Sequence, residues 1–481
     1  MDVLRKNQII QVEIQDIAYG GIGIAKLESK QGDFIVFIEN TIPGQKIEAR
    51  LIKIKKRYAE AKLVRVLERS KDEISLPYQR IPGAPFAQWP IEKQIEAKQK
   101  STLEMFKRIA LEPQIEEKFD EYISSPQIWE YRNKMEYSFS SLESDLETAE
   151  EKWGFALGFK RRGQWWAVEN LEKSSGLFDH DFENLLPKLR SFFEQTKLSA
   201  WNPAESSGFY RFLVLRKSYF DNELLLNLVT SSEGLDQFPR EKFIQILLDN
   251  LGEKIAGIWI TINDDKGDAA KQPSENATLI YGKAKIREKI LGLDFDISMQ
   301  SFFQTNPKSA EKLYSKAISY VESFMSNQKN GNGIAMDLFC GTGTIAQLLS
   351  KSNQIQQVVG VDIVKEAIDD AKMNAEKNSN TKLQFYCADV GKFLVEHPQY
   401  KNKIDLIVLD PPRAGIVPKA LVRTIELGAK AIIYISCNPS TQARDTLVLK
   451  EHGYELKKYA LVDQFPHTAH IESIACFEKK E

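Results

Sequence analysis

A cysteine near the C-terminus has the surroundings of a covalent nucleophile. Cys437 follows the apolar run AIIYIS and precedes Asn438 and Pro439, where a helical stretch begins. A thiolate at a strand terminus beside a helix N-terminus is stabilised and accessible. The other cysteines lie inside apolar runs, where a free cysteine usually acts as a small buried hydrophobic residue: Cys340, Cys387 and Cys476.

Such a thiolate suits the activation of a pyrimidine ring. Carbon 5 of uracil is a poor nucleophile, but thiolate addition at carbon 6 makes an enolate whose carbon 5 can accept a methyl group. A base must then remove the carbon-5 proton. The C-terminal segment offers four candidates for this base: Asp463, His467, His470 and Glu472. Glu472 lies in an apolar, strand-like stretch, where partial burial would raise its pKa. The alternative is an ordinary solvent-facing strand residue.

A glycine loop after an apolar strand predicts a ligand site. The stretch DLFCGTGTIA places Asp337 before Gly341 and Gly343, and a helix follows. Glycines let the backbone approach a ligand closely at a helix N-terminus. The third glycine of a dinucleotide fingerprint is missing, and an acidic residue before the loop repels a pyrophosphate. A carboxylate there suits instead the cationic parts of S-adenosylmethionine.

Three more aspartates stand at strand ends. Asp362 ends VVGVD, Asp389 follows FYCA, and Asp410 ends LIVLD before two prolines. Because the carboxyl ends of parallel strands meet at one edge, we expect these carboxylates beside the glycine loop. Asp362 would accept both ribose hydroxyls and Asp389 would meet the adenine edge. The alternative for each is a turn residue or a helix cap.

These residues need a scaffold that brings strand ends together. From about residue 301 to 481 short apolar strands alternate with glycine loops and helical stretches, which predicts a doubly wound parallel α/β sheet. Residues 71–300 mix strands and helices and predict a central α+β domain. Within it, an amphipathic helix over residues 91–118 could dock on the C-terminal domain.

Residues 1–70 contain alternating apolar strands separated by turn residues, which predicts a five-stranded, OB-like barrel. Its basic and aromatic residues would bind single-stranded or looped RNA: Lys53, Lys55, Lys56, Arg57 and Tyr58. The alternative is an edge strand whose lysines only prevent aggregation.

Bulk composition limits the remaining possibilities. With 481 residues the chain exceeds one hydrophobic core, and 42% hydrophobic and 27% charged residues exclude wholesale disorder. The net charge of −2 gives no global attraction to nucleic acid, so local patches must provide it. The absence of a long apolar run or an N-terminal signal predicts a cytoplasmic protein without a membrane partner. The cysteine spacing predicts no metal site.

At these residues the sequence resembles the RNA uridine-5-methyltransferase family over nearly its whole length. The likeness rests on SFFQTNP, DLFCGTGTIA, LDPPRAG, ISCNPSTQARD and HTAHIES, and the N-terminal unit resembles the TRAM domain. The resemblance implies a class I, Rossmann-like methyltransferase domain that uses S-adenosylmethionine. It makes Cys437 the nucleophile and Glu472 the base. It also implies cofactor contacts, here taken with the loop glycines: Gln304, Phe339, Gly341, Gly343, Thr344, Asp362, Asp389 and Asp410.

The sequence departs from the family at one cofactor. Many relatives hold a four-iron cluster through cysteines after the barrel. Here the corresponding stretch reads LPYQRIPGAPFAQWP and contains no cysteine. Ser174 stands at the position where those relatives have a further cysteine, later in the chain. We therefore predict no iron–sulfur cluster, and apolar, proline-rich packing in its place.

The favoured interpretation is an enzyme that methylates carbon 5 of a uridine in structured RNA. We expect ribosomal RNA rather than transfer RNA as its substrate, and we expect the enzyme to act as a monomer. Cytosine-5 RNA methylation is one alternative, against which the pairing of DPPR with SCNP speaks. An amino-group methyltransferase would carry an aromatic residue where Arg413 stands. A non-catalytic RNA chaperone or assembly factor is the remaining alternative.

Overall fold

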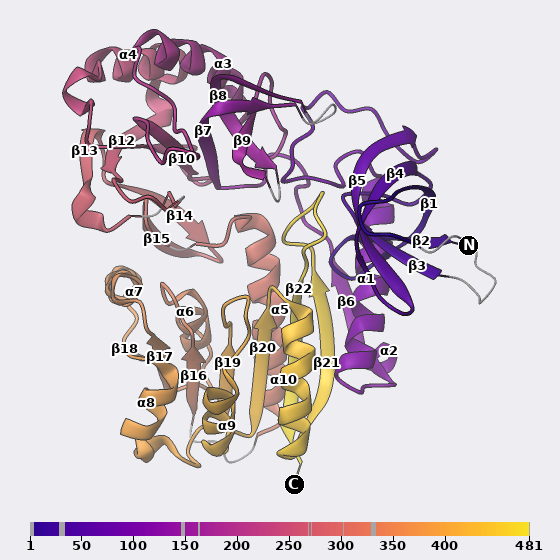
Figure 1. Cartoon of the computed structure of the whole chain (residues 1–481). Coiled ribbons are helices and arrows are strands. Elements are labelled where there is room, and N and C mark those ends of the chain that lie inside the picture. The colour runs from indigo at the N-terminus through magenta and orange to yellow at the C-terminus, as the bar shows by residue number, and fades with distance from the viewer. Residues whose placement is uncertain are drawn as a thin grey trace.

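The chain forms an N-terminal barrel, a central sheet domain and a C-terminal α/β domain (Figure 1). The computed structural model describes residues 4–27, 34–145, 150–161, 164–267, 269–270, 272–301, 303–328 and 333–480. Phe302 of the SFFQTNP motif, and residues 1–3 and 28–33 of the expected first domain, lie outside the described residues. Over the described ranges, no helix is long and apolar enough to cross a membrane.

The barrel is closed, with the strand order β1-β2-β3-β5-β4. Its strands alternate between buried and exposed residues, because successive side chains of a strand point to opposite faces. The alternation fills the interior with residues such as Ile14, Val36 and Leu51. The bounds are β1 (Ile9–Ala18), β2 (Ile22–Leu27), β3 (Phe34–Glu39), β4 (Lys46–Ile54) and β5 (Tyr58–Glu68). The predicted five-stranded barrel is confirmed.

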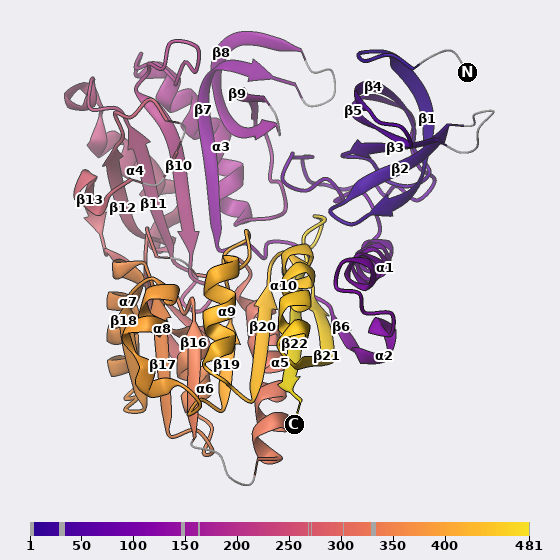
Figure 2. The ribbon, with the colours of Figure 1, turned by 60° about the horizontal axis from the view of Figure 1, so that its bottom comes forward.

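The segment after the barrel joins the C-terminal domain. It contains α1 (Ile91–Ile109), α2 (Ile115–Lys118) and β6 (Phe119–Ile123). The strand β6 pairs in parallel with β21 (Tyr454–Val462) at the edge of the C-terminal sheet. The apolar stripe of α1, which includes Leu103 and Phe106, is buried in the core of that domain. In both ribbon views α1 lies between the barrel and the C-terminal sheet (Figure 2).

The central domain is a seven-stranded sheet of order β13-β12-β11-β10-β7-β8-β9, covered on one face by α3 and α4. The opposite face turns toward the C-terminal domain, where the hairpin β14–β15 packs with that domain's first helix. The bounds are β7 (Lys134–Ser144), β8 (Glu151–Arg161), β9 (Gln164–Asn170), α3 (His180–Gln195), β10 (Tyr210–Lys217), β11 (Leu224–Thr230), α4 (Arg240–Leu251), β12 (Ile255–Ile262), β13 (Ala277–Gly282), β14 (Lys285–Ile290) and β15 (Leu293–Ser298).

The C-terminal sheet has eight strands in the order β18-β17-β16-β19-β20-β22-β21-β6, and only β22 runs antiparallel to its neighbours. The bounds are α5 (Pro307–Ser326), β16 (Ile334–Leu338), α6 (Thr344–Ser350), β17 (Gln357–Asp362), α7 (Lys365–Lys377), β18 (Leu383–Cys387), α8 (Val390–Glu396), β19 (Leu406–Leu409), α9 (Pro418–Glu426), β20 (Ala431–Ser436), α10 (Pro439–Glu451), β21 (Tyr454–Val462) and β22 (Glu472–Lys479).

Helices cover both faces of this sheet, as a doubly wound fold requires. Helices α5 and α6 pack on one face, and α8, α9, α10 and α1 pack on the other. The strand order reverses at β16, from which the chain runs outward to β17 and β18 before it returns to β19. Ligands of open α/β sheets bind at such a switch point, outside the carboxyl ends of the strands. The predicted doubly wound sheet is confirmed.

Candidate active site

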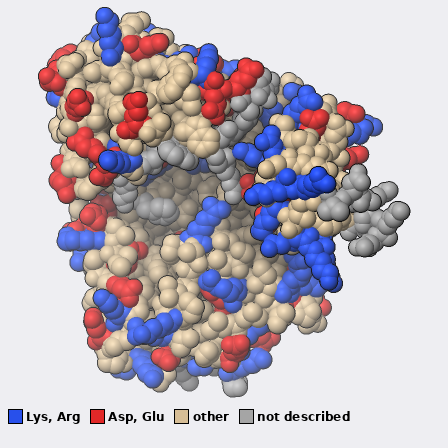
Figure 3. Space-filling model, viewed as in Figure 1, with Lys and Arg blue, Asp and Glu red and all other residues tan. Residues whose placement is uncertain are grey.

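A cavity of about 1410 Å³ lies at the carboxyl edge of the C-terminal sheet, between that sheet and the central domain. Figure 3 shows the surface hollowed between these two domains. Ligand pockets commonly have 300–1,000 Å³, so this cavity has room for more than one small ligand. Its wall joins the glycine loop, at Gly341 and Thr344, to Cys437 and Glu472.

The glycine loop needs its glycines for two different reasons. Gly341 and Gly343 both have positive φ, 52° and 77°. A Cβ at Gly343 would lie 2.7 Å from Cζ of Phe385, whereas a Cβ at Gly341 would have no atom within 4 Å. Gly341 therefore leaves open space at the cavity wall, and Gly343 lets α6 pack tightly against β18.

Alanine at Gly343 should mainly lower the stability of the protein, whereas alanine at Gly341 should mainly lower ligand affinity. We expect Gly343→Ala to destabilise the protein by about 2 kcal/mol or more, because a positive φ and a steric clash combine. Gly341→Ala should cost only about 1 kcal/mol of stability. It should lower the affinity for S-adenosylmethionine more than Gly343→Ala does. Thermal unfolding and calorimetric titration measure the two effects; equal losses of stability would contradict this assignment.

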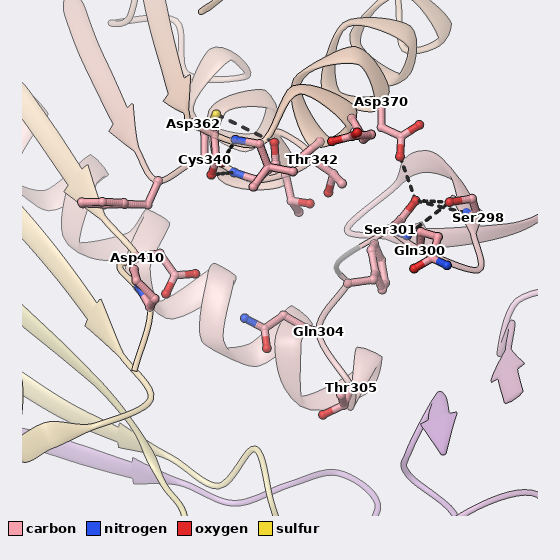
Figure 4. Close-up of a pocket in the computed structure, with 18 of the residues that line it drawn as sticks. Ser298, Gln300, Ser301, Gln304, Thr305, Cys340, Thr342, Asp362, Asp370 and Asp410 are labelled. Carbon is pink, nitrogen blue, oxygen red and sulfur yellow. Dashed lines mark hydrogen bonds between the residues drawn. The ribbon is translucent and has the colours of Figure 1, made fainter. Parts of the chain in front are cut away.

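Asp362 lies where the sequence predicts a ligand-binding carboxylate. It lines the cavity, accepts a hydrogen bond from Gly341 N at 2.9 Å, and accepts another from Val364 N at 2.9 Å. Its carboxylate therefore fixes the glycine loop against β17 while it faces the cavity (Figure 4). The following side chain, Ile363, is 66% exposed and also lines the cavity, so it offers an apolar surface beside the carboxylate. Ile363 is not among the residues predicted from the sequence, although its place directly after Asp362 is a usable signal.

Two other aspartates do not line the cavity. Asp389 is the N-cap of α8 and accepts a hydrogen bond from Lys392 N at 3.0 Å. Asp337 is fully buried beneath the glycine loop and accepts a hydrogen bond from Ala346 N at 2.8 Å. Burial, together with the nearby Asp410, raises the pKa of Asp337. The contacts of Asp389 are therefore those of a helix cap, the alternative to an adenine contact. The hydrogen bond of Asp337 holds α6 against β16.

Three functional groups meet at the cavity from three strands. Asp410 follows β19, Cys437 follows β20, and Glu472 begins β22. Strands β20 and β22 are antiparallel with Ser436 opposite Ser473, which sets Cys437 opposite Glu472 across the strand ends. Cys437 is half-buried, whereas Glu472 is only 3% exposed.

Burial dominates the ionisation of this cluster. It raises the pKa of Cys437 to about 12, and the carboxyls of Glu472 and Asp410 act in the same direction while Arg413 opposes them. Burial likewise raises the pKa of Asp410 to about 7 and that of Glu472 well above its usual range. The sequence predicts a stabilised thiolate, whereas burial in the structure favours the protonated thiol. A cation bound beside these groups would favour their charged forms.

The raised pKa of Cys437 predicts a steep dependence of its reactivity on pH. With a pKa near 12, the thiolate fraction should rise about tenfold per pH unit between pH 7 and 9.5 without a plateau. Saturating S-adenosylmethionine should move the curve to lower pH, because its positive charge favours the thiolate. Iodoacetamide labelling followed at the Cys437 peptide measures both effects, with the exposed Cys387 as internal reference. A plateau below pH 8 without ligand would contradict the burial argument.

Cys387 departs from its sequence interpretation. It was expected to be buried, but it is exposed at the end of β18. Because β18 is an edge strand, its C-terminal residue lacks a neighbouring strand that would cover it.

The loop that follows β15 carries Gln304 into the cavity, near Asp410 (Figure 4). Gln464 donates a long hydrogen bond of 3.4 Å to Gln304 Oε1, and Asn133 donates to its backbone oxygen at 2.9 Å. Arg216, buried in β10, donates to the backbone oxygens of Met299 and Ser301. Arg216 is not among the residues predicted from the sequence, although a charged residue inside the apolar strand YRFLVLRK is a usable signal.

The other predicted residues divide between the cavity and the barrel. Phe339, with a φ of 67°, and Thr344 line the cavity. Lys55, Lys56 and Arg57 form the turn between β4 and β5. Near the end of β4, Lys53 forms a 2.7 Å ion pair with Glu60, and the ring of Tyr58 at the start of β5 packs edge-on against Phe37. None of the five barrel residues lines the cavity; all five lie on or next to this turn: Lys53, Lys55, Lys56, Arg57 and Tyr58. Figure 3 shows Lys and Arg side chains gathered on the barrel.

The segment that would hold an iron–sulfur cluster does not fit one, because no cysteine precedes Cys340 in the chain. Instead, Tyr78 packs on Trp129 with ring centroids 4.7 Å apart, and Trp129 stacks on His467 at 3.8 Å. Ser174 donates a 2.9 Å hydrogen bond to the buried Glu183. Aromatic stacking and buried hydrogen bonds thus supplement the apolar packing that the sequence predicted. Among the described residues, no three His, Cys, Asp or Glu side chains form a metal-binding group.

Comparisons with known proteins agree with this geometry. Residues 280–480 match the family model described as tRNA (Uracil-5-)-methyltransferase, and residues 4–64 match the TRAM domain. An uncharacterized RNA methyltransferase of Clostridium acetobutylicum is 34% identical, with 100% of both chains covered. One of Caldanaerobacter subterraneus is 33% identical, covering 99% of this chain and 100% of its own.

A solved structure is also similar over nearly the whole chain. The Pyrococcus abyssi tRNA (uracil-54, C5)-methyltransferase, in complex with S-adenosyl-L-homocysteine, is 25% identical with a TM-score of 0.69. The match covers 97% of this chain and 100% of that structure. The TRAM barrel, the cavity beside the glycine loop and the similarity to these relatives lead to one conclusion. The chain belongs to the uracil-5 RNA methyltransferase family, whose enzymes use S-adenosylmethionine.

Proposed function

We propose that this enzyme methylates carbon 5 of a specific uridine in structured RNA through a covalent adduct with Cys437. The observation that carries the proposal is the continuous cavity wall that joins the glycine loop to Cys437 and Glu472. A methyl donor bound at the loop and a uracil beside Cys437 would share one space, as group transfer between them requires.

The proposed contacts to the cofactor are cavity-lining residues. When bound, S-adenosylmethionine supplies the electrophilic methyl group and leaves as S-adenosylhomocysteine. Phe339, Gly341, Thr344 and Asp362 would surround it, with Ile363 beside the adenosine. Gln304 and Asp410 (Figure 4) line the same cavity as Cys437, where they would orient the transferring methyl group or the pyrimidine. Gly343 would act through the packing of α6 rather than by direct contact.

The chain's own residues perform the remaining steps. The Cys437 thiolate bonds to carbon 6, which breaks the carbon 5–carbon 6 π bond and places negative charge on the ring carbonyl at carbon 4. Carbon 5 then forms its bond to the methyl group. The Glu472 carboxylate removes the carbon-5 proton, and the electron pair left behind expels the Cys437 thiolate and restores the double bond.

The base needs both its burial and its charge. Burial raises the pKa of Glu472, which makes its carboxylate a stronger base, but also favours the protonated form. A sulfonium cation in the cavity would favour the charged carboxylate of Glu472 and so offset the tendency of burial to keep it protonated. The methyl donor would therefore help to ionise the group that completes the reaction.

The RNA would be held by the barrel and the cavity together. The basic turn of the barrel supplies charge and the ring of Tyr58 a stacking surface. We keep ribosomal RNA ahead of transfer RNA as the proposed substrate. The family model and the Pyrococcus abyssi enzyme are named for tRNA, and the relatives with 33–34% identity name no class of RNA, so RNA mapping decides between the two. We further propose that the enzyme acts as a monomer in the cytoplasm.

Trapping with 5-fluorouridine RNA tests the covalent reaction. Fluorine at carbon 5 cannot leave as a proton, so wild-type enzyme with S-adenosylmethionine should form a denaturation-resistant adduct that contains the transferred methyl group. Methylation of ordinary RNA without any adduct on fluorinated RNA would exclude the covalent step. Methylation found at cytosine would favour the cytosine-5 alternative, and no methylation at all the chaperone alternative.

Mass mapping of RNA from a deletion strain identifies the substrate. Loss of 5-methyluridine at one or two positions of ribosomal RNA, restored by the cloned gene, is the expected result. Loss confined to transfer RNA would overturn the preference for ribosomal RNA but not the chemistry.

A further inference from the structure

The tip of the first barrel hairpin reaches the loop that carries Cys437. Tyr19 lies between β1 and β2, and its hydroxyl donates a hydrogen bond to Asn438 Oδ1 at 3.1 Å. The two residues are separated by 419 positions in the chain. A residue of the barrel therefore contacts the immediate neighbour of Cys437.

Asn438 connects the two loops at the cavity edge. Its Nδ2 donates to the backbone oxygen of Arg413 at 3.0 Å, and its Oδ1 also accepts from Ser440 Oγ at 2.8 Å. The first bond ties the loop after β20 to the loop that contains Asp410. The second belongs to the cap of α10. The orientation of the Asn438 amide thus sets the position of Cys437 relative to Asp410 and Arg413.

The barrel tip is packed against its surroundings. Ile17 and Ile42 of the barrel are buried in one cluster with Phe86 and Trp89. Gly21 has a φ of 75°, and a Cβ there would lie 2.4 Å from Cβ of Ala469, in the loop that leads to Glu472. The hairpin therefore packs directly against the catalytic loops.

The Tyr19 hydroxyl remains a donor over the working pH range. Burial raises the pKa of Tyr19 to about 12, so the phenol keeps its proton. The side chain is half-buried, which limits the competition of water for the amide oxygen.

We propose that Tyr19 is a positioning residue of the active site: its hydrogen bond to Asn438 locks the loop that presents Cys437 to the pyrimidine. The inference rests on the proposed role of Cys437. It gives the barrel a part in the chemical step in addition to RNA binding.

Tyr19→Phe removes the hydroxyl and keeps the ring. With total RNA from a deletion strain and tritiated S-adenosylmethionine, we expect kcat to fall about fivefold while the apparent KM for RNA stays within about twofold. The melting temperature should not change. Tyr320→Phe is the matched control, because it removes a tyrosine hydroxyl bond of the same 3.1 Å length, to Asp120, outside the cavity wall; its kcat should equal that of wild type.

A double-mutant cycle separates positioning from other roles. Asn438→Ala should lower kcat, and adding Tyr19→Phe should lower it no further, because the shared hydrogen bond is already absent. Independent, multiplying losses would overturn the proposal, as would a higher KM with unchanged kcat, which marks Tyr19 as an RNA contact. Unchanged kcat in Tyr19→Phe would do the same. If wild type methylates RNA but forms no adduct with 5-fluorouridine RNA, the covalent mechanism fails instead, independently of Tyr19.

Discussion

Replacing Cys437 with alanine is expected to lower kcat for RNA methylation by roughly 10⁴-fold or more and to abolish the adduct with 5-fluorouridine RNA. Without the sulfur atom, carbon 5 of uracil keeps its low nucleophilicity and no bond forms at carbon 6. The side chain is small and half-buried, so alanine should leave the fold and the affinity for S-adenosylmethionine nearly unchanged. Single-turnover methyl transfer and denaturing gels measure the two losses.

Cys387→Ala is the control for this substitution. Cys387 is a second accessible thiol of the same domain, at the end of β18 and outside the cavity wall. Its replacement should change neither kcat nor trapping. If Cys437→Ala trapped fluorinated RNA as well as wild type, or if Cys387→Ala lost the adduct, the nucleophile would be assigned to the wrong residue.

Replacing Glu472 with glutamine is expected to lower kcat by roughly 10²- to 10⁴-fold and to accumulate a methylated covalent adduct on ordinary RNA. Addition and methyl transfer do not need the base, whereas elimination of the cysteine does. Loss of this neighbouring carboxyl also removes one cause of the raised pKa of Cys437. At a given pH the thiol of the variant should therefore be alkylated faster than that of wild type.

Glu478→Gln is the matched control, because Glu478 lies near the other end of β22 and does not line the cavity. It should turn over normally and accumulate no adduct. Rapid release of methylated product by Glu472→Gln would remove the base role from Glu472 and direct attention to Asp410, the other carboxyl of the cluster.

The cavity is lined by residues of two domains. Its wall combines the strand ends of the C-terminal sheet with central-domain residues such as Asn227 and Trp259. The loop with Gln304 is held from the central domain by Arg216 and Asn133. Residues of other domains thus hold two loops near the cavity. Arg216 and Asn133 of the central domain hold the loop with Gln304, and Tyr19 of the barrel contacts the loop with Cys437.

Local sequence patterns specify the framework of the site. Short apolar strands alternate with helices, and this pattern requires a parallel sheet whose carboxyl ends meet. Asp362, Asp410 and Cys437 stand at such ends, so their convergence followed from local pattern alone. The glycines of the loop were equally readable, since positive φ at Gly341 and Gly343 is a backbone requirement that glycine meets at the lowest cost.

Other features of the site arise from contacts between distant segments, which local patterns do not specify. Asp389 has the same local pattern as Asp362, yet its carboxylate caps a helix while that of Asp362 faces the cavity. The raised pKa of Cys437 comes from burial by residues far away in the chain, whereas the local sequence predicts a stabilised thiolate. The pairing of β6 with β21 and the bond from Tyr19 to Asn438 join segments hundreds of residues apart. Local propensity and periodicity specify elements and their faces, whereas burial, pKa and long-range hydrogen bonds arise only when the elements pack.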